Sequence, residues 1–301
     1  MGVERGAGEV RSSKVTSSEL TAGRGPAGIG APRKPYVTHE GPLFFAHRGG
    51  ARLSPENTLA AFERGVALGA DALELDIQTT REGEIVVIHD TTVDRTTDGR
   101  GPVAGHTLAE LRRLDAGYWF TLDGGRTYPF RGQDVTVPTL REVFECFPRQ
   151  RVNIDLKEST PERERRLWEL IQEVGAEDRT LVASGELHAA IVRFRRLVGE
   201  RVATSASSLE VRNFVLAVWY RGTGRLRPAY VALQVPETWH GIRVVSRRMV
   251  AAAHGRGLDV HVWTVDERAA MEQLLAWGVD GLMTDRPDVL AEALGRGREE
   301  R

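Results

Sequence analysis

Two histidines that follow short apolar runs are the residues of this sequence best suited to acid/base chemistry. His47 comes directly after Leu43–Ala46, and His89 comes directly after Ile85–Ile88. An imidazole titrates near neutral pH, so a pair of them can act as base and acid in one reaction. Beside the first histidine, Arg48 offers a planar fork of N–H donors for a phosphate or a carboxylate. The alternative for a single such histidine is an ordinary strand end that faces water.

Acidic residues at alternate positions in two other apolar runs suggest a cation site. Glu74 and Asp76 are two residues apart, so in a strand their carboxylates share one face. The same spacing separates Asp155 from Lys157. Neighbouring carboxylates inside a fold repel and lose hydration, and a divalent cation relieves both penalties. An all-oxygen ligand set favours Mg²⁺ or Ca²⁺ over zinc, whereas a buried salt bridge between Asp76 and Lys157 is the alternative.

The elements that would position these residues alternate between short apolar runs and longer amphipathic segments. This alternation predicts βαβ units and a mostly parallel sheet. The link 79–84 is too short for a crossover helix, so Ile85–His89 should pair antiparallel with Ala72–Gln78. We expect the other strands at Leu43–Ala46, Val152–Leu156, Thr180–Ser184, Val202–Thr204, Tyr230–Gln234, Asp259–Thr264 and Gly281–Thr284. Helices are expected near 58–69, 107–114, 139–146, 161–175, 186–198, 207–219, 246–256, 267–277 and 287–295.

Eight strands joined by helices predict an α/β fold, a (β/α)8 TIM barrel, with a small inserted subdomain after the second barrel strand. The insertion should cover about residues 90–138 and lie above the barrel mouth. We expect one domain over 41–296, a disordered tail over 1–40 because that segment has few large apolar residues, and a short tail over 297–301.

The composition narrows the classes of partner and compartment. The chain has 41 basic and 42 acidic residues, which gives no electrostatic indication of nucleic-acid binding. No apolar stretch reaches the roughly 18 residues of a membrane span, so we expect no integral membrane segment, although peripheral lipid contact stays open. Cys146 is the only cysteine, and no secretory signal is evident, which favours a cytoplasmic location. Two imidazoles beside paired carboxylates, Arg48 and Lys157 are the groups that phosphodiester cleavage needs, so the expected partner is a small-molecule phosphodiester. The sequence does not define an oligomeric state.

Other polar and aromatic residues allow weaker expectations. His261 lies in an apolar run and should be a satisfied core histidine. Gly49 and Gly50 should let the backbone pass close to a phosphate. A further group of residues forms either an apolar and basic shoulder beside the mouth or a surface that packs on the barrel: Trp219, Tyr220, Arg225, Arg227, Gln234, Trp239 and His240.

Seven motifs in order resemble the glycerophosphodiester phosphodiesterase family, a group of phospholipase-C-like TIM barrels. They extend over about residues 43–295. The motifs are His47-Arg48-Gly49, Glu56-Asn57-Thr58, Glu74-Leu75-Asp76, His89-Asp90 with Arg95-Thr96-Thr97, Asp155-Leu156-Lys157, Val262-Trp263-Thr264-Val265 and Thr284-Asp285-Arg286-Pro287-Asp288. One departure is Asp155, because the family usually has the longer glutamate at that position.

The resemblance implies a divalent-cation-dependent phosphodiesterase and a role for each matched residue. A hydroxyl of the substrate would attack phosphorus, and water would then open the cyclic intermediate. The implied roles are an acid/base pair (His47 and His89), metal ligands (Glu74, Asp76 and Asp155), phosphate ligands (Arg48 and Lys157), a residue that supports the metal or substrate site (Glu56) and an apolar wall (Trp263).

Three hypotheses about function follow. The first is hydrolysis of glycerophosphodiesters, the deacylated phospholipids, to glycerol 3-phosphate and an alcohol. The second keeps the chemistry but acts on lysophospholipids, as a lysophospholipase D does, and depends on the apolar segment 211–220. The third is a non-catalytic phosphate-binding barrel, which would be expected to lack a histidine or a carboxylate that this sequence retains.

Overall fold

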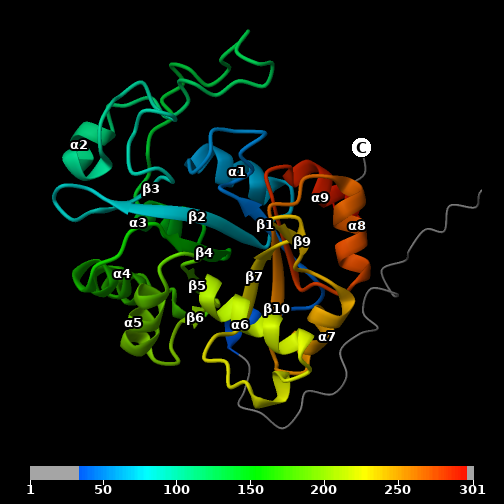
Figure 1. Ribbon diagram of the computed structural model, residues 1–301. Helices are drawn as coiled ribbons and strands as arrows, with labels where there is room; N and C mark the ends of the chain where they lie inside the picture. Colours follow the sequence, from blue (N-terminus) through cyan, green and yellow to red (C-terminus); the bar gives the residue numbers. More distant parts are fainter. Residues whose placement is uncertain (1–33, 297–301) are drawn as a thin grey trace, which may run out of the picture.

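A computed structural model describes residues 34–296 of the chain. Residues 1–33 of the expected tail over 1–40, and the expected tail over 297–301, lie outside the described residues. Within them, eight parallel strands form a nearly closed barrel in the order β6-β5-β4-β2-β1-β11-β10-β7 (Figure 1). The strands are β1 (Leu43–His47), β2 (Ala72–Thr79), β4 (Arg151–Leu156), β5 (Thr180–Ala183), β6 (Ala203–Thr204), β7 (Ala232–Pro236), β10 (Asp259–Trp263) and β11 (Gly281–Thr284). The predicted TIM barrel is therefore confirmed.

The barrel closes at a seam between β6 and β7. The Ala206 N–H donates to the Ala232 carbonyl at 2.9 Å, and the Val231 N–H donates to the Thr204 carbonyl at 3.0 Å. An isolated parallel bridge joins Ser205 to Ala232 at the same point. By contrast, β2 and β4 pair along six residues, from Ala72 opposite Arg151 to Ile77 opposite Leu156. The seam is therefore the most weakly paired part of the wall.

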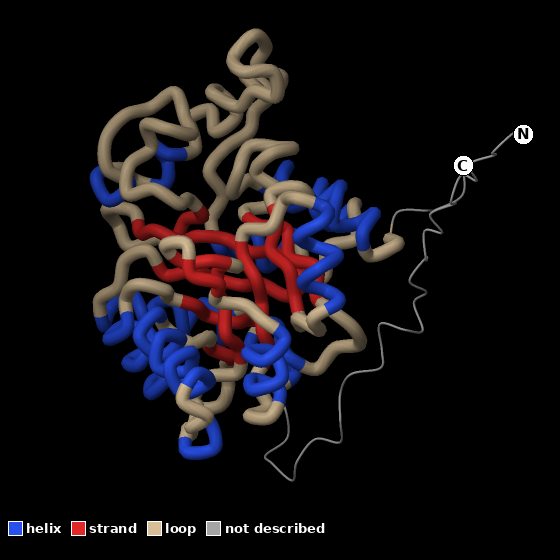
Figure 2. Tube along the Cα trace, turned by 45° about the vertical axis from the view of Figure 1, so that its right-hand side comes forward, coloured by secondary structure: helices blue, strands red, loops and turns tan. Residues whose placement is uncertain are grey.

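Helices surround the strands, as Figure 2 shows by the helical tubes outside the central strands. They are α1 (Leu59–Ala67), α2 (Leu108–Leu111), α3 (Leu140–Cys146), α4 (Pro161–Glu173), α5 (His188–Val198), α6 (Ser208–Trp219), α7 (Arg247–His254), α8 (Arg268–Ala276) and α9 (Pro287–Ala293), with 3-10 turns η1 (Pro35–Val37), η2 (Val103–Gly105), η3 (Glu177–Arg179) and η4 (Thr223–Arg225). Several begin at polar caps. The hydroxyls of Thr139 and Ser207 each accept a backbone N–H in a reciprocal capping box, which satisfies donors that a helix end leaves free.

Alternation along the strands separates the core into two layers. Leu73, Leu75 and Ile77 of β2 belong to the large cluster between the strands and the helices. The residues between them, Glu74 and Asp76, lie on the opposite face, inside the barrel. This is the arrangement expected from the two-residue spacing, and it puts two carboxylates in the interior.

The floor of the barrel is closed by a segment that was expected to be part of a disordered tail. Pro35–Val37 forms η1, and Tyr36 and Val37 are buried with Leu43 and Phe45 in an interior apolar cluster. The Arg151 guanidinium at the start of β4 donates to the carbonyl of Tyr36 at 2.9 Å. The packed chain therefore begins before residue 41, because the buried side chains of Tyr36 and Val37 fill the floor of the barrel.

The insertion begins with β3 (Ile85–Val87), which pairs antiparallel with β2 as predicted. The chain beyond it has its own small apolar cluster, which includes Val93, Val103 and Leu111. In Figure 1 these segments, with α2, project from one end of the barrel. That end carries the carboxyl ends of the strands, where TIM barrels build their sites.

The expected apolar and basic shoulder does not form as one surface. Trp219 and Tyr220 end α6, and Arg225 and Arg227 precede the amino end of β7, at the floor side of the barrel. Arg256, after α7, donates to the Leu226 carbonyl at 2.6 Å and fixes this loop there. Only Trp239 and His240 lie at the mouth. They belong to a hairpin that the sequence analysis missed, β8 (Thr238–Trp239) with β9 (Ile242–Arg243), while Gln234 points inward and donates to Asn153 at 2.7 Å.

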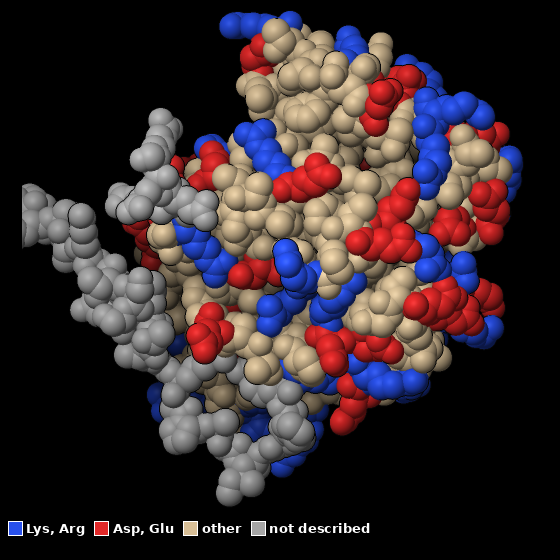
Figure 3. Space-filling model, turned by 180° about the vertical axis from the view of Figure 1, so that it is seen from behind, with Lys and Arg blue, Asp and Glu red and all other residues tan. Residues whose placement is uncertain are grey.

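The surface carries charges of both signs. On the face shown in Figure 3, Lys and Arg side chains are interspersed with Asp and Glu. No helix in the described part of the chain has the length and apolar character needed to cross a membrane.

Candidate active site

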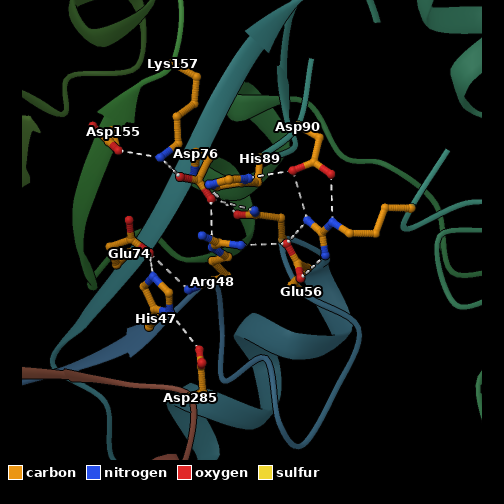
Figure 4. A network of polar contacts seen from close by, with 12 residues as sticks. His47, Arg48, Glu56, Glu74, Asp76, His89, Asp90, Asp155, Lys157 and Asp285 are labelled. Carbon is orange, nitrogen blue, oxygen red and sulfur yellow. Dashed lines mark hydrogen bonds and ion pairs between the residues drawn. The ribbon is translucent and has the colours of Figure 1, made fainter. Parts of the chain in front are cut away.

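Most of the residues expected at the site come together at the carboxyl ends of β1, β2 and β4 (Figure 4). His47 ends β1, and Glu74 and Asp76 lie on the neighbouring strand β2. The remaining members of the cluster are Arg48, Glu56, His89, Asp155 and Lys157. Trp263 lies at the end of β10, opposite Pro236 of β7, and is 39% exposed. The mouth thus has a charged side on β1, β2 and β4 and an apolar side on β7 and β10.

His47 is hydrogen-bonded to one carboxylate and lies near a second. Its Nδ1 donates to Asp285 Oδ1 at 2.6 Å, and its Nε2 lies 3.7 Å from Glu74 Oε2. Burial alone would lower the pKa of His47, but Glu74 and Asp285 outweigh it and raise the pKa. Asp285 received no role from the sequence, although its place directly after β11 at the mouth is a signal that could have indicated one.

His89 has the same kind of partner on the same nitrogen. Its Nδ1 donates to Asp90 Oδ1 at 2.6 Å. The backbone before it continues along β2, since the Ile88 N–H donates to the Asp76 carbonyl at 3.0 Å. The side-chain amide of Gln78 donates to the His89 carbonyl at 3.1 Å. In both histidines a carboxylate accepts the Nδ1 proton, so Nε2 is the nitrogen that could exchange a proton with a bound molecule.

A chain of ion pairs connects the surroundings of the two histidines. Arg95 donates from Nε to Asp90 at 2.7 Å and from its two Nη atoms to Glu56 at 2.7 and 2.8 Å. Glu56 also accepts from Arg48 Nη1 at 3.0 Å. The Arg95 hydrogen bonds lower the pKa of Asp90 to about 2. The family motifs contained Arg95, but only the fold shows that it bridges the insertion and the loop after β1.

The Asp76 carboxylate contacts two cationic side chains and one amide. Lys157 Nζ lies 3.0 Å from its Oδ1, and the Asn57 amide donates to its Oδ2 at 2.9 Å. Arg48 Nε is 3.1 Å from Oδ2, an ion-pair distance, but its N–H is not aligned for a hydrogen bond. Lys157 also donates to Asp155 Oδ2 at 2.6 Å. This arrangement contains the Asp76–Lys157 salt bridge that was the alternative to a metal site.

The donor chemistry nevertheless fits a divalent cation. Glu74, Asp76 and Asp155 supply carboxylate oxygens from adjacent strands, and Asp76 and Asp155 are direct neighbours in register. Burial, with the negative charge of Asp76 and Asp155, raises the pKa of Glu74 to about 7, so negative charge there is incompletely balanced. As arranged, the described residues contain no group of three acidic, histidine or cysteine side chains at ligand spacing. A cation would have to replace the Lys157 ammonium between Asp76 and Asp155.

The loop after β1 carries two residues in the left-handed backbone region, Arg48 with φ 49° and Asn57 with φ 59°. This conformation is disfavoured for residues other than glycine, so the Asn57 N–H bond to the Arg48 carbonyl at 2.9 Å helps to hold both. Gly49 and Gly50 are required by the packing of this loop, and their expected approach to a phosphate stays a prediction. A Cβ on Gly49 would lie 2.6 Å from the Cβ of Ala61, and one on Gly50 would lie 2.6 Å from Pro287. These glycines allow the loop to pack on α1 and α9.

His261 is a core histidine, but it is not fully satisfied. The ring is completely buried, and its Nδ1 lies 3.3 Å from the amide nitrogen of Gln234. Its Nε2 makes no hydrogen bond and lies 3.9 Å from Asp259 Oδ2. The sequence pattern predicted the burial correctly, but it could not show that one nitrogen would lack a partner.

Comparison with known proteins gives consistent matches. The model of the glycerophosphoryl diester phosphodiesterase family matches residues 47–289. The glycerophosphodiester phosphodiesterase of Caldanaerobacter subterraneus subsp. tengcongensis is 36% identical over 262 residues, which are 85% of this chain and 98% of that protein. A lysophospholipase D of Mus musculus is 28% identical over 275 residues, covering 83% of this chain and 85% of that protein.

Among solved structures, a phosphodiesterase of Oleispira antarctica in complex with the product sn-glycerol-3-phosphate aligns with a TM-score of 0.65 and 25% identity, over 84% of this chain and 97% of that chain. The family match covers most of the chain, and the Caldanaerobacter relative aligns over nearly its full length. The chain therefore belongs to the glycerophosphoryl diester phosphodiesterase family and is an enzyme of the phosphoric diester hydrolase class.

Proposed function

We propose that this enzyme hydrolyses glycerophosphodiesters, such as glycerophosphocholine or glycerophosphoethanolamine, to glycerol 3-phosphate and the free alcohol. The observation that carries the proposal is the pair of imidazoles, each with Nδ1 tied to a carboxylate at 2.6 Å, beside carboxylates and cations at one mouth. The family match and the glycerol 3-phosphate complex of the Oleispira relative support the substrate class.

In the proposed reaction His47 and His89 move protons through Nε2. One histidine removes the proton from a substrate hydroxyl as its oxygen attacks phosphorus, and the other protonates the departing alcohol. The cyclic phosphodiester formed in this step is then opened by water with the roles reversed. Arg48 and Lys157 bind the phosphate oxygens, which requires both side chains to loosen their contacts with Asp76.

We further propose that a divalent cation, Mg²⁺ or Ca²⁺, binds to Glu74, Asp76 and Asp155. When bound, it would neutralise the carboxylates and the developing charge on the phosphate oxygens. Lys157, released from Asp76 and Asp155, then becomes available to the phosphate. Glu56 keeps Arg48 in place from the other side, and Trp263 forms an apolar wall for the glycerol or the alcohol.

Release of glycerol 3-phosphate from glycerophosphocholine tests both parts of this proposal. We expect turnover with Mg²⁺ or Ca²⁺, loss of turnover in EDTA, and recovery when the cation is added back. Failure to release glycerol 3-phosphate under any of these conditions would disprove the substrate assignment. Full turnover in EDTA after dialysis would disprove the cation requirement while leaving the two-histidine chemistry in place.

The domain and compartment assignments also remain proposals. We place the catalytic domain at residues 41–296, extended by the floor segment that begins at Pro35, with 90–138 as its insertion. A cytoplasmic location stays a prediction. The non-catalytic phosphate-binding barrel is not supported, because both histidines are oriented for proton transfer and the relatives are enzymes.

A second candidate substrate class is the lysophospholipids. The observation that favours it is the apolar side of the mouth, where Trp263 is continued outward by a hairpin with Trp239 59% and Ile242 55% exposed. Trp239 and Ile242 are opposite each other in the hairpin, so their side chains share one face. The relationship to the Mus musculus lysophospholipase D also favours it. An acyl chain could lie along this surface.

A double variant, Trp239→Ser with Ile242→Ser, separates the two substrate classes. If lysophosphatidylcholine is a substrate, its KM should rise several-fold, while glycerophosphocholine, which has no acyl chain, should be unaffected. The matched control is Trp219→Ser with Tyr220→Ser, which removes exposed aromatic area at the opposite end of the barrel. Equal effects on both substrates would exclude an acyl-chain role for the hairpin.

A further inference from the structure

We propose that Arg95 is a positioning residue that orients His89 through Asp90 and, with its other side, holds Glu56 against Arg48. The proposal rests on the proposed acid/base role of His89. It gives the insertion after β3 a role in positioning residues of the proposed site.

The contacts of Arg95 are unusually complete for a side chain that is about half exposed. Its Nε donates to Asp90 Oδ2 at 2.7 Å, and its Nη2 donates to Asp90 Oδ1 at 3.2 Å. The two Nη atoms also donate to the two oxygens of Glu56 at 2.7 and 2.8 Å. A planar guanidinium can hold two carboxylates in this way, whereas a lysine ammonium cannot fix the orientation of either.

One side of this clamp controls His89. Asp90 Oδ1 accepts the Nδ1 proton of His89, and among the described residues Arg95 supplies the only other hydrogen bonds to the Asp90 side chain. Without Arg95, the Asp90 carboxylate loses these hydrogen bonds and can rotate away from His89. The imidazole of His89 is then no longer held in one orientation. Proton transfer depends steeply on the placement of the donor and acceptor, so a loose imidazole lowers the rate of the chemical step.

The other side of the clamp controls Arg48. Glu56 is shared between Arg95 and Arg48, whose Nη1 donates to Glu56 Oε1 at 3.0 Å. Glu56 belongs to the loop after β1, while Arg95 belongs to the insertion after β3, so the clamp joins two segments that are distant in sequence. Loss of Arg95 therefore loosens both a proton-transferring group and a proposed phosphate ligand. These two effects can be separated kinetically.

A double-mutant cycle between Arg95 and Asp90 tests the proposal in the full-length enzyme with saturating Mg²⁺. We expect Arg95→Ala to lower kcat about 30- to 100-fold, less than the roughly 10²- to 10⁴-fold that acid/base catalysis contributes, because His89 itself remains. In the Asp90→Ala background, Arg95→Ala should lower kcat by less than about threefold, because the residue through which it acts is already gone. Independent multiplication of the two effects would overturn the proposal, as would an Arg95→Ala kcat within twofold of the parent.

Two further variants exclude a purely structural role. Arg95→Lys keeps the charge but loses the fork, so it should recover less than a tenth of the lost kcat; full recovery would contradict the geometric role. Millimolar guanidinium chloride should partly restore kcat to Arg95→Ala and should have no effect on His89→Ala. Arg95→Ala should also raise KM, because Glu56 no longer holds Arg48 in place. Glu56→Gln should reproduce this rise in KM but not the loss in kcat. A loss in kcat as large as that of Arg95→Ala would refute the division into two sides.

Arg100→Ala is the matched control. Arg100 lies in the same insertion, is 86% exposed and only approaches Asp94 at 3.9 Å, so its removal should leave kcat and KM unchanged. The result for His89→Ala separates this inference from the proposed function. If His89→Ala is fully active, the acid/base assignment fails and the inference fails with it. If His89→Ala is inactive and the cycle is additive, only the role of Arg95 is wrong.

Discussion

The two histidine–carboxylate pairs at the mouth have the same Nδ1 geometry but different supports. His47 ends a barrel strand, and its partner Asp285 directly follows the adjacent strand β11. His89 follows the shorter strand β3, and its partner Asp90 is held by a side chain of the insertion, Arg95. The first pair is therefore fixed by paired strands of the barrel wall, whereas the second also depends on an ion-paired clamp.

The surrounding charge differs as well. Next to His47, burial and neighbouring carboxylates raise the pKa of Glu74 to about 7. Next to His89, the hydrogen bonds from Arg95 lower the pKa of Asp90 to about 2. His47 thus lies beside Glu74, whose negative charge is only partly neutralised by its surroundings. His89 lies beside Asp90, whose negative charge is paired with Arg95. A closed wall can impose such an unfavourable charge, because strand pairing holds the group in place.

Removal of either imidazole should have the largest effect on kcat, and the effect should be similar for the two histidines. We expect His47→Ala and His89→Ala each to lower kcat for glycerophosphocholine on the order of 10³-fold, because each removes one proton-transferring group. Glycerol 3-phosphate release measures the rate, and the unchanged far-ultraviolet circular dichroism of each variant serves as the control. Near-normal turnover in one variant would leave a single histidine in the mechanism.

The supporting carboxylate at His47 can be tested through the pH dependence. Burial opposes a high pKa for His47, while Glu74 and Asp285 raise it, so Asp285→Asn should lower the pKa of His47. The corresponding limb of the kcat/KM profile should move to lower pH by up to about one unit, with roughly a 10-fold loss in maximal rate. A limb that stays in place would show that Asp285 has no electrostatic influence on catalysis.

Glu74 and Asp90 should change the stability of the folded chain in opposite directions as the pH rises. The pKa of Glu74 is raised in the folded chain, so its favourable contribution is complete below its unfolded value of 4.5 and is lost as the pH rises to about 7. The pKa of Asp90 is lowered, so its contribution is present above 3.8 and is lost as the pH falls to about 2.

Thermal melting in EDTA measures this difference. Glu74→Gln should raise the melting temperature by a few degrees at pH 8 and should flatten its dependence between pH 5 and pH 8, since about 1 kcal/mol corresponds to roughly 2–4 °C for a domain of this size. Asp90→Asn should instead flatten the decline below pH 4. A parent protein whose stability does not change between pH 5 and pH 8 would contradict the raised pKa of Glu74.

The apolar side of the mouth should show the smallest effect. Trp263 is partly exposed and donates no group to the reaction, so Trp263→Leu should change kcat/KM for glycerophosphocholine by less than about fivefold, mainly through KM. A loss comparable to that of Asp285→Asn would mean that Trp263 helps to position the reacting groups.

Strand and helix periodicity predicted the barrel and the inward face of Glu74 and Asp76, because both depend on local alternation that the sequence displays directly. The short link 79–84 predicted the antiparallel return of β3. The partners of the histidines were not predictable in the same way. Asp285 reaches His47 across 238 residues because β11 pairs with β1, and Arg95 reaches Glu56 across 39 because the insertion meets the loop after β1. Both contacts are tertiary and leave no local pattern in the sequence. The sequence also left two alternatives open for Trp219, a shoulder beside the mouth or a surface that packs on the barrel, because its position follows from the direction of α6 rather than from its composition.

The seam between β6 and β7 has fewer backbone hydrogen bonds than the β2–β4 pairing, so the barrel wall should be locally less stable there. The proposed site lies on the other side of the wall, on the contiguous strands β11, β1, β2 and β4, so a brief opening of the seam would leave it undisturbed. Amide protons of Ala206 and Val231 should then exchange with solvent sooner than those along the β2–β4 pairing. New termini introduced near this seam would leave the catalytic strands in one uninterrupted block, which makes it a favourable place for circular permutation of the chain.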